Sequence, residues 1–125
     1  MSEIIRPERM KSDLELHVEC LSHENSAVRQ IALKELAQIR DSKAFPFVRQ
    51  HLAEISRLLK DPHPLTRSRA VDVLVLFGNY SVLEDLRKVA SNADEQEDIR
   101  ERAKLAISKI DEAEKYRFDR LFKGP

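Results

Sequence analysis

An internal repeat constrains the fold of this chain more than any other feature. An arginine recurs at Arg29, Arg67 and Arg100, and an alanine follows each of them three residues later. Leucine or isoleucine comes seven places after each arginine, and a large apolar residue comes ten places after it. The intervals between the arginines match the length of one helical hairpin, and self-similarity at such a period indicates a solenoid of stacked hairpins.

Apolar residues recur at helical spacing along nearly the whole chain, which favours helices throughout. The 125 residues contain only 2 Gly and 5 Pro, so the chain has few places at which to turn. Its richness in Leu, Ala, Glu, Lys and Arg is also typical of helices. We therefore predict an all-α solenoid of about three helical hairpins followed by a C-terminal helical extension.

The turn signals divide this solenoid into units within a single domain, 1–125. Pro7 suits the first turn of the first helix, and Gly78-Asn79 ends the central one. The predicted units are repeat 1 at 7–40, repeat 2 at 41–78, repeat 3 at 79–110, and a terminal helix or cap at 111–122. The two helices of repeat 1 are assigned from two apolar stripes. They are Met10, Leu14, Val18 and Leu21 in the first helix, and Val28, Ile31, Ala32, Leu36 and Ile39 in the second.

Two histidine-containing segments raise the question of a metal or catalytic site. In KDPHPLTRSRAVDVL, His63 stands between two prolines. A metal or catalytic site would need further His, Cys or carboxylate groups beside it, and the nearby sequence offers only Asp61. In HVECLSHE, His17, Cys20 and Glu24 fall on one side of a helix, but the spacing matches no established zinc finger. We interpret the first segment as a turn and Cys20 as a small apolar residue. The sequence predicts no catalytic residue, no metal and no cofactor.

The middle unit, LLKDPHPLTRSRAVDVLVLFG, resembles a HEAT repeat, and all three units fit the same frame. The resemblance implies a hydrogen-bonded ladder in which the turn aspartate and the arginine link neighbouring repeats. Its expected members are Asp61, Arg67, Asp94 and Arg100. The first unit departs from the pattern because His23 stands where the aspartate belongs.

The resemblance also implies that the second helix of each hairpin lines the inner, partner-binding face. The residues expected there are Gln30, Lys34, Ser68, Arg69, Asp72 and Arg102. Asp72 is the least expected of them, because it interrupts the apolar run AVDVLVLF. Two interpretations stay open. Asp72 lies on an exposed strip of that face, or it is buried and paired with a cation such as Arg69.

Charge and motif content rank the classes of function. The chain has 22 basic and 22 acidic residues, so no net field would attract nucleic acid or an anionic membrane. A single cysteine and the absence of a long apolar run favour a soluble, cytoplasmic protein. We predict a non-enzymatic adaptor or accessory subunit that binds a protein or peptide. Nucleic-acid binding through Arg69 and Arg102 is the alternative, and a lyase-like or glycosylase-like enzyme is less favoured.

The segment YRFDRLF, at 116–122, places four large apolar residues after the last complete repeat. Either these residues cap the open end of the solenoid, or they form an exposed helix for docking or for homo-oligomer formation. We prefer the cap, because an uncovered apolar end promotes aggregation.

Overall fold

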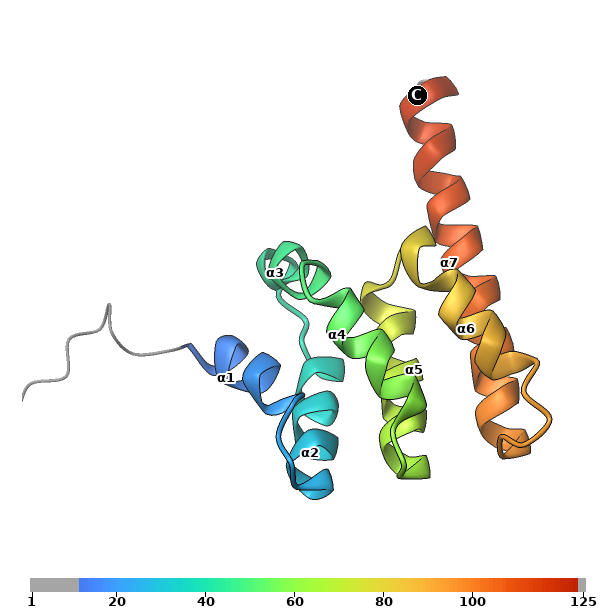
Figure 1. Ribbon diagram of the computed structural model, residues 1–125. Coiled ribbons are helices and arrows are strands. Elements are labelled where there is room, and N and C mark those ends of the chain that lie inside the picture. The colour runs from blue at the N-terminus through green and yellow to red at the C-terminus, as the bar shows by residue number, and fades with distance from the viewer. Residues whose placement is uncertain (1–11, 124–125) are drawn as a thin grey trace, which may run out of the picture.

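The computed structural model describes residues 12–123, which form helices and turns without a β-strand (Figure 1). Pro7 and Met10 lie outside these residues. The helices are α1 (Asp13–Cys20), α2 (Ser26–Ala37), α3 (Phe45–Arg49), α4 (Leu52–Arg57), α5 (Pro64–Phe77), α6 (Leu83–Ala90) and α7 (Glu97–Lys123). Short 3₁₀ turns are η2 (Ser42–Ala44), η3 (Leu58–Lys60) and η4 (Tyr80–Val82).

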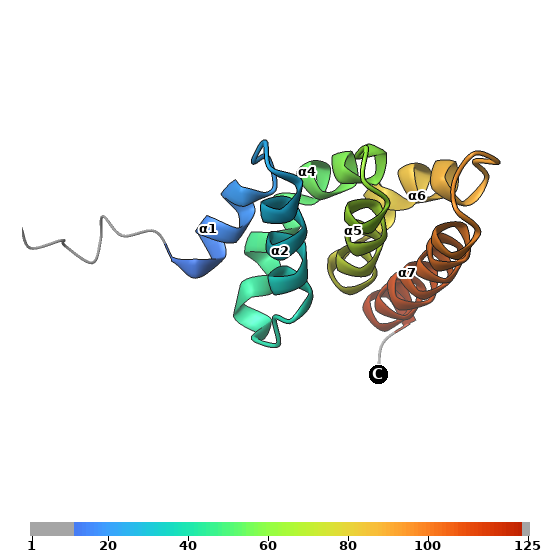
Figure 2. The ribbon, with the colours of Figure 1, turned by 90° about the horizontal axis from the view of Figure 1, so that it is seen from below.

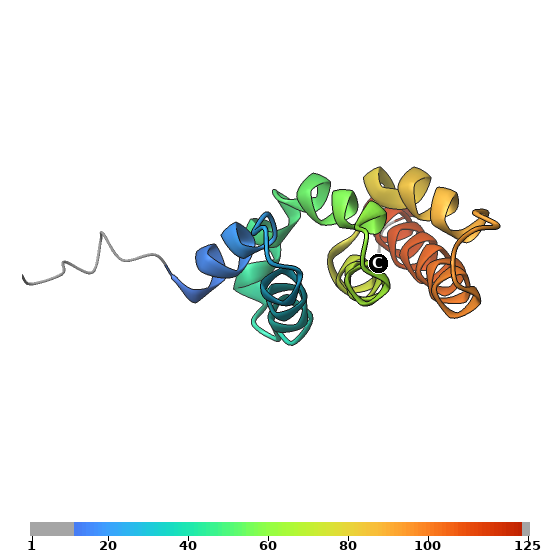
Figure 3. The same ribbon diagram turned by 60° about the horizontal axis from the view of Figure 1, so that its bottom comes forward.

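The helices form two layers, as Figures 2 and 3 show. One layer holds the first helices of the hairpins, α1, α3–α4 and α6, and the other holds the second helices, α2, α5 and α7. Within the second layer α5 packs against α2 on one side and against α7 on the other. This arrangement is a solenoid of three hairpins, so the predicted all-α solenoid is confirmed.

Side-chain caps account for the places where the chain turns. The side-chain oxygens of Asn25, Asp41 and Asn79 each accept a hydrogen bond from the backbone N–H two residues later. Pro46 and Pro64 lie in the first turns of α3 and α5, where a missing N–H leaves no hydrogen bond unmade. The turns therefore fall where the sequence indicated.

Gly78 terminates α5 at a point where the backbone packs closely against its neighbours. Its φ of −69° is open to any residue, so conformational freedom is not the reason for glycine here. A Cβ at this position would collide with the Leu74 carbonyl oxygen and lie 2.9 Å from both Ile110 Cδ1 and Val82 Cγ2. The absence of a side chain lets the end of α5 pack against η4 and α7.

Two details differ from the sequence-based expectation, which includes one continuous helix at 45–59 from the spacing of Phe45, Val48, Leu52, Ile55 and Leu59. His51, with φ −114° and ψ 19°, separates α3 from α4, although the apolar stripe continues through it as Val48, Leu52 and Ile55. Ile31 was expected in the core but is 56% exposed, whereas Leu33 is fully buried. Because α1 and α5 cover two sides of α2, the side facing neither helix is left to Ile31.

The helix predicted at 111–122 is present, but the preferred role of its apolar residues as a cap is wrong. Helix α7 runs straight through Asp111 and projects beyond the hairpins (Figure 1). Its last apolar residues are the most exposed large apolar residues of the described chain, with Leu121 73% and Phe122 72% exposed. Near the tip, the Phe118 and Phe122 rings pack against each other, with centroids 4.5 Å apart.

Candidate functional site

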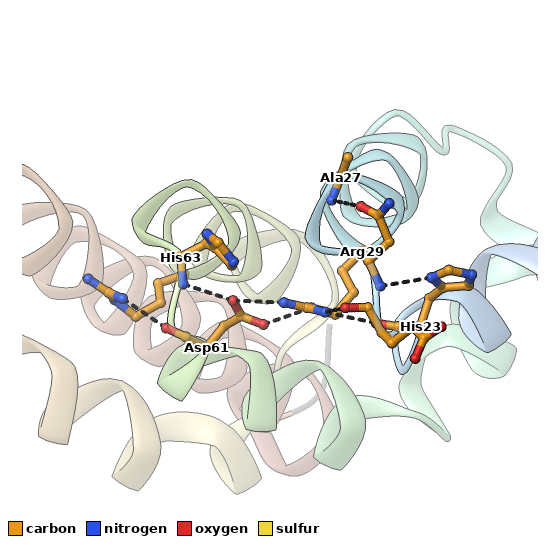
Figure 4. Close-up of polar contacts among 8 residues, drawn as sticks. His23, Ala27, Arg29, Asp61 and His63 are labelled. Carbon is orange, nitrogen blue, oxygen red and sulfur yellow. Dashed lines mark hydrogen bonds and ion pairs between the residues drawn. The ribbon is translucent and has the colours of Figure 1, made fainter.

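Arg29 of α2 links the first hairpin to the second. Its Nε and Nη2 donate to the two carboxylate oxygens of Asp61 at 2.8 and 3.3 Å, as Figure 4 shows. Its Nη1 donates to the carbonyl oxygens of His23 and Glu24 in its own hairpin, at 2.8 and 3.0 Å. One guanidinium thus holds the turn of repeat 1 and the turn of repeat 2 together.

Arg67 of α5 repeats this arrangement at the next junction. Its Nε and Nη2 donate to the Glu95 carboxylate at 2.7 and 2.9 Å, and its Nη1 donates to the Asp61 carbonyl at 2.8 Å. The predicted Asp94 is therefore wrong as a ladder carboxylate. Asp94 is exposed, and the turn from Asn92 directs the next residue, Glu95, inward.

Arg100 completes the series by holding its own turn. Its Nη1 donates to the carbonyl oxygens of Asn92, Ala93 and Glu95, and the shortest of these bonds is 2.6 Å. Arg29, Arg67 and Arg100 each bind the backbone of the preceding turn. The first two also bind a carboxylate of the following repeat, so the carboxylate contacts run between repeats rather than within them.

Both ladder carboxylates are buried, and their surroundings shift their pKa values. Burial alone would raise the pKa of Asp61, but the His63 N–H and the Arg29 guanidinium outweigh it and lower that pKa. The hydrogen bonds from Arg67 lower the pKa of Glu95 against the opposing effect of burial. Both groups are therefore held as carboxylates, which favours folding wherever the unfolded chain would bind more protons.

The histidine between two prolines belongs to this structural turn. His63 is exposed and N-terminal to α5, and its backbone N–H donates to Asp61 Oδ1 at 2.9 Å. In the HVECLSHE segment, His23 Nδ1 accepts a hydrogen bond from the Asn25 N–H. Across residues 12–123 no group of three or more His, Cys, Asp or Glu side chains is arranged to hold a metal ion.

Two further arginines, Arg69 and Arg102, lie on the second helices α5 and α7. Arg102 Nη1 of α7 donates to both Asp72 carboxylate oxygens of α5 at 3.0 and 3.2 Å. Arg69 of α5 donates to the Gln30 carbonyl oxygen of α2 at 3.0 Å. The Asp72 and Arg102 side chains are 46% and 51% exposed, so Asp72 lies on the exposed strip, with Arg102 rather than Arg69 as its partner.

A shallow groove of about 430 Å³ surrounds this ion pair. Its apolar walls come from Val71, Val75, Leu76 and Leu105, and Asp72, Arg102 and Lys109 supply its charges, with Ala37 of α2 at one edge. Leu76 is 42% exposed and Leu105 57% exposed. We call this surface, Ala37, Val71, Asp72, Val75, Leu76, Arg102, Leu105 and Lys109, the α5–α7 groove.

Three comparisons with known proteins bear on this arrangement. A family model described as HEAT repeats matches residues 53–118, which is more than half of the chain. The chain belongs to the HEAT-repeat family. HEAT repeats generally mediate protein–protein interaction and are generally non-catalytic. A search of curated proteins and a search of solved structures return no match.

Only part of the predicted set of face residues lies in the α5–α7 groove. Asp72 and Arg102 lie in it, and Arg69 lies beside it on α5. Lys34 is exposed on α2, and Gln30 and Ser68 are half-buried. The sequence-based set omitted Leu76, Leu105 and Lys109, although Leu105 occupies the position in repeat 3 that Lys34 and Asp72 occupy in repeats 1 and 2. That shared position was the signal by which Leu105 could have been found.

Within residues 12–123, no helix combines the length and the apolar character needed to cross a bilayer.

Proposed function

We propose that this HEAT-repeat protein is a non-enzymatic adaptor or accessory subunit that binds a segment of another protein in the α5–α7 groove. The observation that carries the proposal is the exposed Asp72–Arg102 pair set among Leu76 and Leu105. A protein segment offers apolar side chains for such walls and charged groups for such a pair.

The chemistry of the groove suits a partner with an apolar residue flanked by charges. An acidic side chain of the partner would approach Lys109 and Arg102, and a basic one would approach Asp72. Because the pair is half-exposed, exchanging its internal contact for an intermolecular one costs little free energy. The partner is therefore expected to bind with specificity set by charge order and with affinity set by Leu76 and Leu105.

Nucleic-acid binding through Arg69 and Arg102 has less support. Arg69 donates to the Gln30 carbonyl and Arg102 to the Asp72 carboxylate, so phosphate would have to displace existing contacts. Asp72 also places a negative charge at the centre of the face. Sequence-independent binding to phosphates needs several unopposed cations.

We propose protein as the partner class, the cytoplasm as the location, and 1–125 as one domain of three repeats.

The test captures the tagged protein from its native cell extract at physiological salt, with and without nuclease. The wild type is compared with the double variant Asp72→Ala/Arg102→Ala. The matched control is Glu84→Ala/Arg87→Ala, which removes one acidic and one arginine side chain from the exposed surface of α6 in the other layer.

We expect a stoichiometric protein that is retained after nuclease by the wild type and by the control, and that the groove variant loses. Equal retention by all three proteins would move the binding site away from the groove. Loss of every bound protein after nuclease, with recovery of nucleic acid, would overturn the proposal in favour of the alternative.

A further inference from the structure

The last part of α7, residues 111–123, is a helix without neighbours from the hairpins on most of its surface (Figure 1). We call it the extension. Four large apolar side chains are exposed along it, namely Tyr116 (64%), Phe118 (56%), Leu121 (73%) and Phe122 (72%). A helix that exposes this much apolar surface gains free energy when another apolar surface covers it.

Charges divide the extension into two opposite halves. Its first four residues carry three acidic side chains, Asp111, Glu112 and Glu114, and no basic one. The remaining nine residues, 115–123, carry four basic side chains and one acidic side chain. An identical helix laid antiparallel would place the acidic half of each copy beside the basic half of the other. A parallel arrangement would place like charges together.

An apolar groove of about 440 Å³ lies at the base of the extension. Phe45 of α3, Val75 and Leu76 of α5, and Ile110 and Ala113 of α7 line it, with Arg49 and Arg117 among its polar members. Glu114 pairs with Arg117 at 3.1 Å beside this groove. The molecule therefore presents an apolar tip on the extension and an apolar groove at the base of the same helix.

We propose that a second copy of this chain occupies the groove, and that two extensions pair antiparallel about Arg117. At 1.5 Å per residue, a crossing at Arg117 places Leu121 of each copy level with Ala113 of the other, which lines the groove. Each tip then fills the base groove of its partner, and each acidic half meets a basic half. The interface is isologous, as two-fold symmetry requires.

The first experiment is sedimentation equilibrium of the full chain, from micromolar to millimolar concentration. We expect a reversible dimer with a dissociation constant in the micromolar range, because the contact is small. Phe118→Ser and Leu121→Ser should each raise that constant at least about tenfold. Both side chains are exposed in the monomer, so its folding should be unaffected, which circular dichroism would verify.

Tyr116→Ser is the matched control. Tyr116 is as exposed as Phe118, but two residues turn a helix by about 200°, so it lies on the opposite side. This variant should dimerise as the wild type does. A monomeric wild type at millimolar concentration would overturn the proposal, and so would an equal effect of all three substitutions.

Charge reversal tests the pairing of the two halves directly. Asp111→Lys/Glu112→Lys makes the extension mainly basic, and Arg120→Glu/Lys123→Glu makes it mainly acidic. Each variant alone should be monomeric, and an equimolar mixture should form a heterodimer. Two variants that each dimerise alone would contradict the proposal. None of these changes alters a residue of the α5–α7 groove and no partner is present, so failure to dimerise would leave the proposed function standing. Val75 and Leu76 line both grooves.

Discussion

Two kinds of arginine–carboxylate pair join the repeats of this protein, and they differ in burial rather than in chemistry. The ladder pairs, Arg29–Asp61 and Arg67–Glu95, have carboxylates that are only 4% exposed. The face pair, Asp72–Arg102, has a carboxylate that is 46% exposed. A buried carboxylate depends on its partner for solvation, whereas an exposed one can take water or another molecule instead. The ladder is therefore structural, and the face pair is free to act in binding.

The largest expected effect comes from Arg67→Met, which keeps the apolar stem and removes the charge. Glu95 would stay buried without its partner, and the Asp61 carbonyl would lose a donor. We expect the free energy of unfolding to fall by about 3 kcal/mol, measured by urea denaturation. Arg87→Met, at an exposed position of α6, is the control and should change it by less than about 0.5 kcal/mol. Similar values for the two variants would refute a structural role of the ladder.

A smaller and more local effect is expected at the first junction. Arg29→Met leaves Asp61 with the His63 N–H, just as Arg67→Met leaves Glu95 with the Gln96 N–H, but Arg29 holds the first of the described repeats, so the loss should be about 2 kcal/mol. Within residues 12–123, repeat 1 packs against a repeat on one side, whereas α5 packs between α2 and α7, so α2 should open more readily than α5. Amide hydrogen exchange should show lost protection in α1 and α2 with α7 unchanged. Uniform loss along the chain would argue against this local role.

Acid should remove the stability that the two ladder carboxylates contribute. The pKa values of Asp61 and Glu95 are lowered in the folded protein from ordinary values of 3.8 and 4.5. A lowered folded-state pKa contributes stability above the unfolded-state value, and this contribution is lost as pH falls through the folded-state value. Stability should therefore decline below about pH 4.5. The decline should be shallower in Arg67→Met, and equal slopes would disprove the assignment to Glu95.

The smallest effect on stability is expected for the face pair. Arg102→Met removes a half-exposed guanidinium whose partner, Asp72, can be hydrated in its place. The free energy of unfolding should change by about 0.5 kcal/mol or less. A loss as large as that of Arg67→Met would mean that the face pair is a third step of the ladder.

The ladder positions of Asp61 and Arg67 were predicted from the spacing that the repeat preserves. Arg100 was predicted as well, but it binds the backbone carbonyls of its own turn. The sequence missed Arg29, because His23 stands where the aspartate of the first repeat belongs. It did not predict Glu95, because SNADEQE offers two neighbouring acids and only the geometry of the turn decides which one points inward. The exposure of Ile31 was not predicted, for a related reason. Periodicity marks an apolar residue, but which side of α2 is covered depends on how α1 and α5 pack against it.

The candidate site was predicted in part. Asp72 and Arg102 were both expected on the face, but their pairing joins α5 to α7 and depends on the offset between repeats, which no local pattern contains. The extension shows the converse case. Its apolar residues were plain in the sequence, yet the choice between cap and free helix depended on whether α7 bends at Asp111, and it does not.

The most direct test of this division measures stability and partner retention on the same preparations of Arg67→Met and Arg102→Met. Urea denaturation gives the first quantity, and retention of the captured partner after nuclease gives the second. The account predicts that Arg67→Met loses stability but, where still folded, retains the partner, and that Arg102→Met keeps stability and loses the partner. The reverse pattern, or two variants impaired equally in both measurements, would contradict it.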